Sequence, residues 1–278
     1  MIKPLVTITI PTYNSAQFLK LCLKAIKSQT YDNFEINIVD GYSSDDTLKI
    51  TKEFGVKRIL HYKGYLLGAR YQGVKASNGS YVLILDSDQV LEKTAIERAV
   101  DMALKNNLKM LVLEENVYKC DTFIEKLFDM DRRLFNAVCD LDPYTGVILP
   151  RFFETKLLNQ AYENIPREIF SKTGGPDHAI VYLEAYQIDP AVAVLPVAVR
   201  HIEPSSIRVL WRKFYRWGYT SVTAHDFGKY HTLMTRKERF RTGVFTHGML
   251  VESLGSMLLL VLKGLAFKFG YFMAKSGL

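Results

Sequence analysis

Four apolar segments of strand length alternate with segments of helical periodicity in residues 1–115, and this alternation limits the possible folds more than any other feature. The apolar segments are residues 5–10, 34–39, 81–85 and 110–113. Their length and β-branched content favour strands, whereas apolar residues between the first two segments recur at the spacing of a helix. The alternation predicts an α/β fold, with a mostly parallel central sheet flanked by helices.

Polar clusters follow three of these segments directly. They are PTYN at residues 11–14, DGYSSDD at residues 40–46 and DSD at residues 86–88. In a parallel sheet the carboxyl ends of the strands lie at one edge, and ligands bind at that edge. We therefore expect the three clusters to form one binding site.

The last cluster places Asp86 and Asp88 one residue apart at the end of a buried strand. Two carboxylates at this spacing repel each other unless a cation lies between them or water screens them. The pair is therefore either a solvated turn or a metal site. The two other Asp-x-Asp pairs, at residues 129–131 and 140–142, do not follow an apolar strand.

After residue 114 the alternation of strand-length and helical segments is less regular. We expect a helix near residues 121–138 and a strand within residues 142–153. Ser205 or Ser206 is a suitable N-cap for a further helix that runs through Arg216, because a hydroxyl oxygen can accept from a free backbone N–H of the first turn.

Two domains are expected, a catalytic domain at residues 1–203 and a basic, apolar, membrane-associated tail at residues 204–278. The net charge is +7, and residues 200–241 contain ten Lys and Arg residues against three acidic residues, so this segment carries the whole excess. Such a segment suits an anionic partner, whether substrate phosphates, lipid headgroups or nucleic acid. The alternative is an ordinary solvated helical face.

The segment 247–278 is apolar and aromatic. Its longest uncharged run, residues 253–262, is shorter than the ~20 apolar residues that a spanning helix needs. Lys263, Lys268 and Lys275 can extend from an interfacial helix to water while the apolar side chains enter the headgroup region. We expect a peripheral or shallowly inserted membrane-surface anchor, with a buried C-terminal hairpin as the alternative.

The three cysteines, Cys22, Cys120 and Cys139, lack the spacing of a metal site, and the sequence does not open with a secretory signal pattern. An odd cysteine count without such a signal favours a reducing interior. Together with the expected anchor, this indicates the cytoplasmic face of the cell membrane.

Two stretches resemble the family 2 glycosyltransferases, which have the GT-A nucleotide-sugar fold. Residues 6–47 look like the nucleotide-binding opening of that family, and residues 68–88 look like its central segment, which ends at the metal motif. The resemblance extends from Val6 to about Trp217. It implies an inverting enzyme that uses a nucleotide sugar with Mn²⁺ or Mg²⁺.

Later residues are similar to the cellulose-synthase-like branch, which has a spaced Asp, an Asp-x-Asp, an acidic base motif and Gln-x-x-Arg-Trp. The matching positions are Asp40, Asp86 with Asp88, Asp177 in GGPDH, and KFYRW at residues 213–217. Two residues depart from the pattern: Pro176 stands where an acidic residue is usual, and Lys213 replaces the glutamine. The polymer synthases of this branch are far larger, so the resemblance implies a transferase that adds one sugar.

The resemblance also implies roles for individual residues. Those expected to bind the nucleotide sugar are Pro11, Thr12, Tyr13, Asp40, Arg70, Asp86, Ser87, Arg212, Arg216 and Trp217. Those expected at the metal are Asp86, Asp88 and His201, with Asp88 as the direct ligand. The alternatives are a helix-capping or turn aspartate for Asp40, a surface ion pair for Arg70 and a structural role for His201.

Asp177 is the expected general base, which takes a proton from an acceptor hydroxyl as that oxygen attacks the anomeric carbon. Its alternative role is a helix N-cap, because GGPD is also favourable turn-and-cap chemistry. We expect the next residue, His178, to be exposed on the helix. Arg151, in PRFF, is a further candidate without a discriminating context.

These patterns predict transfer of one hexose from a nucleotide sugar to a polyprenyl- or dolichyl-linked acceptor. By resemblance we favour mannose from GDP-mannose; UDP-glucose or UDP-GlcNAc with a lipid or polysaccharide acceptor is the alternative. A basic membrane- or nucleic-acid-binding scaffold without catalysis would leave the strand-end motifs unexplained. A sugar-nucleotide pyrophosphorylase would need a glycine-rich loop after the first strand, and PTYNSAQ has no glycine. We expect neither a nucleic-acid partner nor an obligate protein partner.

Overall fold

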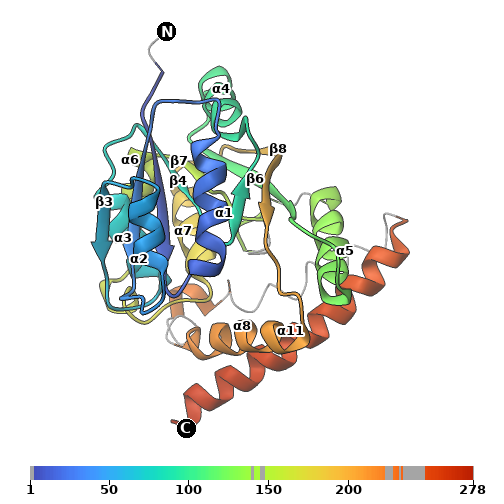
Figure 1. The fold of residues 1–278 in the computed structure, drawn as a ribbon. Helices are drawn as coiled ribbons and strands as arrows, with labels where there is room; N and C mark the ends of the chain where they lie inside the picture. Colours follow the sequence, from blue (N-terminus) through green and yellow to red (C-terminus); the bar gives the residue numbers. More distant parts are fainter. Residues whose placement is uncertain are drawn as a thin grey trace.

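The computed structural model describes residues 3–138, 141–144, 148–222, 228–231, 233 and 248–277. In this part of the chain a central sheet has the strand order β3-β2-β1-β4-β7-β6-β8-β5. Helices lie on both sides of the sheet, and a long C-terminal helix runs beneath it (Figure 1).

The strands are β1 (Val6–Thr12), β2 (Phe34–Asp40), β3 (Arg58–His61), β4 (Tyr81–Ile84), β5 (Gln89–Leu91), β6 (Met110–Val117), β7 (Phe152–Glu154) and β8 (Val192–His201). The α-helices are α1 (Ala16–Lys27), α2 (Thr47–Glu53), α3 (Leu66–Lys75), α4 (Ala95–Asn106), α5 (Phe123–Val138), α6 (Thr155–Glu163), α7 (Asp177–Ile188), α8 (Ile207–Tyr219) and α11 (Leu250–Ser276). Short 3₁₀ turns occur at η1 (Arg167–Ile169) and η2 (Gly228–Tyr230).

The expected α/β fold with a mostly parallel sheet is confirmed. Strands β3, β2, β1 and β4 are parallel to one another, and β6 is parallel to β8. Two strands run the other way: β7 lies antiparallel between β4 and β6, and β5 pairs antiparallel with β8.

The strand expected within residues 142–153 is much shorter than the pattern indicated. In the described part of this segment only β7 forms, at its end, and residues 145–147 lie outside the described residues. Pro143 and Pro150 have no backbone N–H to donate to a sheet, which accounts for the late start of the strand.

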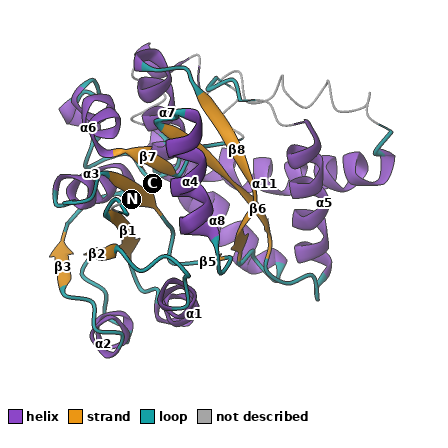
Figure 2. Cartoon of the chain, turned by 90° about the horizontal axis from the view of Figure 1, so that it is seen from above, coloured by secondary structure: helices purple, strands orange, loops and turns teal. Residues whose placement is uncertain are grey.

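The apolar run of β4 is continuous because both faces of the sheet are covered. Leu83 packs into a core with α1 and α4, whereas Val82 and Ile84 point to the opposite core with α3, α6 and α7. Figure 2 shows α1 and α2 on one side of the β1–β2 region and α3 and α6 on the other. Burial on both faces is typical of strands in a parallel sheet, so the sequence of such a strand does not alternate between apolar and polar residues.

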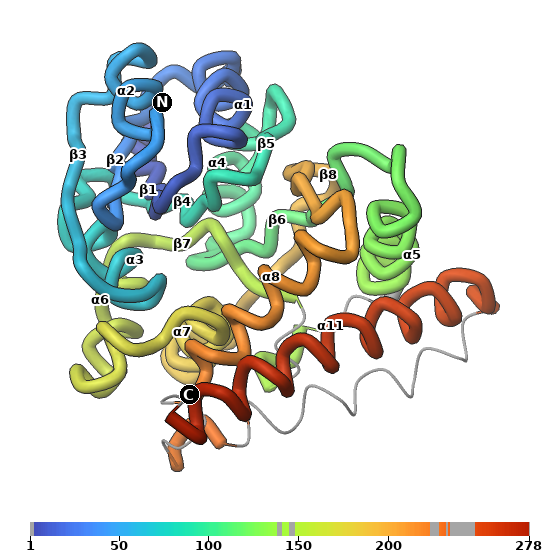
Figure 3. The backbone as a smooth tube through the Cα atoms, turned by 60° about the horizontal axis from the view of Figure 1, so that its bottom comes forward, coloured from blue at the N-terminus to red at the C-terminus, as the bar shows by residue number. Residues whose placement is uncertain are grey.

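A third apolar cluster joins α5, α8 and α11. Figure 3 shows α8 and α11 side by side along the bottom of the molecule. Helix α8 begins where the sequence indicated, since Ser206 is its N-cap and the Ser206 hydroxyl accepts from Val209 N at 3.4 Å. The division of the chain at residue 203 stays a prediction, although α8 and α11 both pack closely on neighbouring elements.

Helix α11 is one continuous helix and not a hairpin. Lys263 lies within this helix, and its ammonium pairs with the Asp131 carboxylate on α5 at 3.0 Å. Ser256 of α11 also donates to Asp131. By length and composition alone the helix could cross a membrane, which differs from the expectation based on its longest uncharged run.

The backbones of α8 and α11 touch at two glycines. A Cβ on Gly218 would lie 2.0 Å from the carbonyl oxygen of Phe267, and a Cβ on Gly270 would lie 2.0 Å from that of Tyr215. Gly264, on the same helix α11, has no neighbouring atom within 4 Å of such a Cβ.

We predict that Gly270→Ala destabilises the protein by about 1–3 kcal/mol, because the added methyl group forces the two helices apart. Gly264→Ala is the matched control and should be stabilising by up to about 1 kcal/mol, since alanine favours a helix over glycine. Chemical denaturation of the protein in mild detergent measures both changes. Equal stability of the two variants would contradict the close packing of α8 on α11.

Candidate active site

The carboxyl ends of β1 and β2 meet around the buried carboxylate of Asp40. Its Oδ1 accepts from the Thr12 hydroxyl at 2.9 Å and from the Ser43 hydroxyl at 2.6 Å, and its Oδ2 accepts from Ser43 N at 2.8 Å. Asp40 therefore orders its own loop. The structure brings Thr12 and Asp40 together as expected, with Pro11 buried beside them in β1.

This loop presents aromatic rings to solvent. Tyr13 and Tyr42 are 61% and 62% exposed. Tyr42 has a φ of 62°, a left-handed conformation that few residues adopt, and its ring stacks on His61 with centroids 5.3 Å apart. Exposed rings can hold a planar group by stacking. Tyr42 and His61 were not singled out from the sequence, although Tyr42 lies within DGYSSDD.

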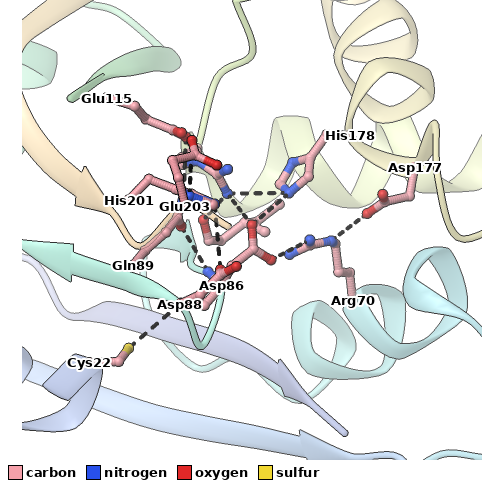
Figure 4. A network of polar contacts seen from close by, with 12 residues as sticks. Cys22, Arg70, Asp86, Asp88, Gln89, Glu115, Asp177, His178, His201 and Glu203 are labelled. Carbon is pink, nitrogen blue, oxygen red and sulfur yellow. Dashed lines mark hydrogen bonds and ion pairs between the residues drawn. The ribbon is translucent and has the colours of Figure 1, made fainter. Parts of the chain in front are cut away.

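A second group of residues centres on Asp86, at the end of β4 (Figure 4). The Asp86 carboxylate accepts from Arg70 Nη2 at 2.6 Å and from Arg151 Nη1 at 3.1 Å. Arg70 also donates through Nε to Asp177. One buried guanidinium from α3 thus joins the strand-end aspartate to the expected general base on α7.

Arg70 has one further donor. Its Nη1 is buried and has no hydrogen-bond partner within the described residues. A buried donor without a partner costs free energy, so this group is available to a ligand. The surface ion pair considered for Arg70 is wrong, because the side chain is only 2% exposed.

The two carboxylates on Arg70 differ in pKa. Burial would raise the pKa of Asp86, but Arg70 and Arg151 outweigh it and hold that pKa well below its usual value. For Asp177, burial is the larger effect and is only partly offset by Arg70, so its pKa is raised. Asp86 is therefore a permanent anion, whereas Asp177 is the better proton acceptor.

The start of α7 does not use Asp177 as a cap. Pro176 holds the N-cap position without a side-chain capping bond, and Asp177 is the first helical residue. The preceding loop packs tightly on the end of α8: a Cβ on Gly175 would lie 2.9 Å from the carbonyl oxygen of Trp217. Helix α8 thereby positions the loop that carries Asp177.

The expectation of an exposed His178 is wrong. Its side chain is 12% exposed, and its Nε2 lies 3.9 Å from Asp86 Oδ2 and 3.3 Å from Arg151 Nη1. Burial and the two arginines Arg70 and Arg151 lower its pKa well below the usual value, so the imidazole is neutral. Arg151 is likewise a central member of the group.

Asp88, two residues after Asp86, contacts a different set of side chains. Its Oδ1 lies 3.5 Å from His201 Nε2, and its Oδ2 lies 3.5 Å from Lys213 Nζ. The other ring nitrogen of His201 lies 3.2 Å from Glu203. Burial lowers the pKa of His201, but the charges of Glu203 and Asp88 outweigh it and raise the pKa.

A buried network of ion pairs contacts the partners of Asp86 and Asp88. Glu115 accepts from Gln89 Nε2 at 3.0 Å and pairs with Arg151 and with Arg132, the latter at 3.0 Å. Burial would raise the pKa of Glu115, but the arginines lower it to about 2. Sequence reasoning missed Glu115, Arg132 and Glu203; the signal was present in LEEN, where the apolar run of β6 ends on two acidic residues.

The side chains around Asp88 include possible ligands for a divalent cation. Asp88 and His201 supply one carboxylate oxygen and one imidazole nitrogen that face each other, a pair that suits Mn²⁺ or Mg²⁺ when substrate oxygens complete the shell. Asp86 is less suited to direct ligation, because both of its oxygens accept from arginines. No group of three or more His, Cys, Asp or Glu side chains that could hold a metal ion occurs among the described residues. The residues fit a cation that shares its coordination with a ligand.

The remaining expected site residues lie on α8 and in the turn that follows β4. Arg212 lines a hollow with Arg208, Trp211, Tyr215 and Phe269 on the side of α11. Arg216 is exposed, and Trp217 packs edge-on against Phe214 with ring centroids 5.0 Å apart. Ser87 lies in the turn between Asp86 and Asp88. In the contacts of the described residues, only Lys213 of α8 reaches the aspartate pair.

The family model described as "Glycosyl transferase family 2" matches residues 7–179, which is more than half of the chain. Among curated proteins, the Escherichia coli UDP-Glc:alpha-D-GlcNAc-diphosphoundecaprenol beta-1,3-glucosyltransferase WfgD is 28% identical over 138 residues, 48% of this chain and 54% of the relative. The chain thus spans about half the length of that relative.

Two solved structures are similar in fold. The mannosyltransferase PcManGT from Pyrobaculum calidifontis, in complex with GDP-Man and Mn²⁺, has a TM-score of 0.61 and 16% identity, covering 100% of this chain and 80% of the other. S. aureus TarS 1–349 in complex with UDP-GlcNAc has a TM-score of 0.56 and 14% identity, covering 98% and 92%. The family match covers more than half of the chain, and the strand-end acidic residues and the shared fold agree with it. The chain is therefore a member of glycosyl transferase family 2.

Proposed function

We propose that this protein transfers one hexose, with inversion, from a nucleotide sugar to a lipid-linked acceptor at the cytoplasmic face of a membrane. The observation that carries the proposal is the contact of Arg70 with both Asp86 and Asp177. It joins an anionic strand-end site to a carboxylate of raised pKa, and a transferase needs both a donor site and a base.

The donor site is formed by the two groups at the carboxyl edge of the sheet. The rings of Tyr13 and Tyr42 offer surfaces for a nucleobase next to the Asp40 loop. The unpartnered Nη1 of Arg70 is a charge-assisted donor for a ribose or phosphate oxygen. When bound by Asp88 and His201, Mn²⁺ or Mg²⁺ would neutralise charge on the departing nucleoside diphosphate.

Asp177 acts on the acceptor. It takes the proton from an acceptor hydroxyl while that oxygen attacks the anomeric carbon from the side opposite the diphosphate, which inverts the configuration. Arg70 fixes the position of Asp177 relative to Asp86. The neutral His178 fills the space beside Asp86 without adding a charge.

GDP-mannose is our favoured donor and UDP-glucose or UDP-GlcNAc the alternative. The structural neighbour PcManGT is described with GDP-Man, whereas TarS is described with UDP-GlcNAc and WfgD is named for UDP-Glc. WfgD is also named for an acceptor on diphosphoundecaprenol, which supports a lipid-linked acceptor here.

The membrane is the proposed site of action because α11 is apolar on its outward face. The exposed side chains of this face include Leu254, Met257, Val261, Leu265 and Phe269, whereas its polar Ser256 and Lys263 point inward to Asp131 on α5. A helix with this arrangement gains free energy by burying its outer face in lipid. Its packing along α5 and α8 favours a helix that lies on the membrane.

A donor panel tests the function. GDP-mannose, UDP-glucose, UDP-GlcNAc and UDP-galactose are supplied with a polyprenyl-lipid extract and Mn²⁺ or EDTA. We expect transfer of one sugar from one donor, which EDTA and Asp88→Asn both abolish, because the leaving diphosphate then lacks its cation. Asp129→Asn, in the Asp-x-Asp of α5, is the matched control and should keep the activity. No transfer and no donor binding under any condition would overturn the proposal.

The role of Asp177 is tested separately. Asp177→Asn keeps an oxygen that can accept from Arg70, so donor affinity should stay within about threefold of wild type. The rate on a sugar-hydroxyl acceptor should fall ~10²–10⁴-fold, because the variant cannot take a proton. Asp189→Asn, just after the other end of α7, serves as the control. If Asp177→Asn turns over such an acceptor at the wild-type rate, Asp177 is not the base.

Membrane binding is measured by flotation with liposomes that contain an anionic lipid. Leu265→Lys should weaken binding at least about tenfold, because a leucine contributes roughly 1.5–3 kcal/mol when buried in an apolar phase. Leu104→Lys, on α4, is matched in exposure at 55% against 56% for Leu265 and should bind normally. Equal flotation of the two variants would exclude the outer face of α11 as the contact.

A further inference from the structure

Lys213 stands apart from the other basic residues of α8. Arg208 and Arg212 line the hollow near α11, and Arg216 is exposed, but the Lys213 ammonium lies 3.5 Å from Asp88 Oδ2. Its side chain is 19% exposed. Lys213 is therefore the residue through which α8 contributes a charge to the candidate active site.

The position of Lys213 is well defined by α8. Its ammonium lies over the Trp217 ring, 5.7 Å from the centroid, one turn along the same helix. The helix itself is fixed by the Ser206 cap and by the close contact of Gly218 with α11. The ammonium is thus held at the rim of the site at the end of a four-carbon stem that can still adjust.

The contacts of Asp88 are looser than those of Asp86. Asp86 accepts from Arg70 at 2.6 Å, whereas Lys213 and His201 each lie 3.5 Å from Asp88. Charge-assisted N–H···O bonds are normally about 2.7–2.9 Å long. Asp88 therefore has counter-charges nearby that are not bound tightly, and an ammonium with three donors can bond a second anion without leaving the carboxylate.

A diphosphate that approaches Asp88 meets a carboxylate of the same sign. Without a positive charge between them, the two anions repel. Either a divalent cation on Asp88 and His201 or the Lys213 ammonium can supply that charge. Both approach the same carboxylate, so they compete for it.

We propose that Lys213 is a resident cation of the donor site, which binds the diphosphate of the nucleotide sugar and lowers the dependence of donor binding on a divalent metal. This inference rests on the proposed function, because it requires a diphosphate ligand at Asp88. It predicts a coupling: removal of Lys213 weakens diphosphate binding in the absence of metal and strengthens metal binding in the absence of diphosphate.

The test measures binding of UDP and GDP to the full chain in detergent by calorimetry, with EDTA or with saturating Mn²⁺. Lys213→Gln removes the charge and keeps the length, Lys213→Arg keeps the charge, and Lys105→Gln on the exposed face of α4 is the matched charge control. In EDTA, Lys213→Gln should bind the diphosphate roughly 10- to 100-fold more weakly than wild type, the value of a charge-assisted hydrogen bond. In Mn²⁺ the difference should shrink to less than about threefold, because the metal then supplies the charge. Lys213→Arg and Lys105→Gln should bind as wild type does.

Electron paramagnetic resonance of Mn²⁺ without nucleotide gives an independent readout. Lys213→Gln should bind Mn²⁺ more tightly than wild type, because the ammonium no longer competes for Asp88. The role of Lys213 would be overturned, without affecting the proposed function, if wild type and Lys213→Gln bound the diphosphate equally in EDTA. An equal loss of diphosphate affinity with and without Mn²⁺ would overturn it in the same way. A wild-type protein that binds neither UDP nor GDP in any condition would overturn the proposed function, and this inference with it.

Discussion

The site is organised by one buried guanidinium. Arg70 comes from α3, on one face of the sheet, and its two ion pairs join the end of β4 to the start of α7. Burying a charge is costly unless it is paired and hydrogen-bonded, so Arg70 needs these carboxylates to offset the cost of its burial. The positions of Asp86 and Asp177 are therefore mutually dependent. Their pKa values differ because two arginines outweigh the effect of burial at Asp86, whereas Arg70 only partly offsets it at Asp177.

Helix α8 connects this site to the outside of the molecule. One side of the helix carries Lys213 toward Asp88, and another side forms the hollow of Arg208, Trp211 and Phe269 beside α11. Its C-terminal end packs on the glycine loop before Asp177. A displacement of α8 would thus move the groups around both Asp88 and Asp177. This helix is a direct physical link between the apolar face of the protein and the candidate active site.

Much of the fold could be predicted because it rests on local patterns. The strands β1, β2, β4 and β6, the Ser206 cap and the edge where the polar clusters meet all follow from spacing and residue type. The partners of the site residues could not be predicted in this way. Glu115 and Arg132 have the composition of a solvated surface, and only the tertiary fold pairs them. His178 was misplaced although α7 is apolar on nearly all sides, which is typical of a buried helix whose first-turn polar groups must point into a site.

The place of β7 in the sheet sets the order in which the protein can mature during synthesis. This strand lies between β4 and β6 but comes later in the chain than both. The half-sheet of β1 to β4 can close as soon as it leaves the ribosome, whereas β6 cannot join it until β7, at residues 152–154, is available to pair with both β4 and β6. Over that interval the apolar edge of β4 is open to wrong partners. A nascent chain of this protein should therefore depend on chaperones most strongly between the emergence of β6 and that of β7.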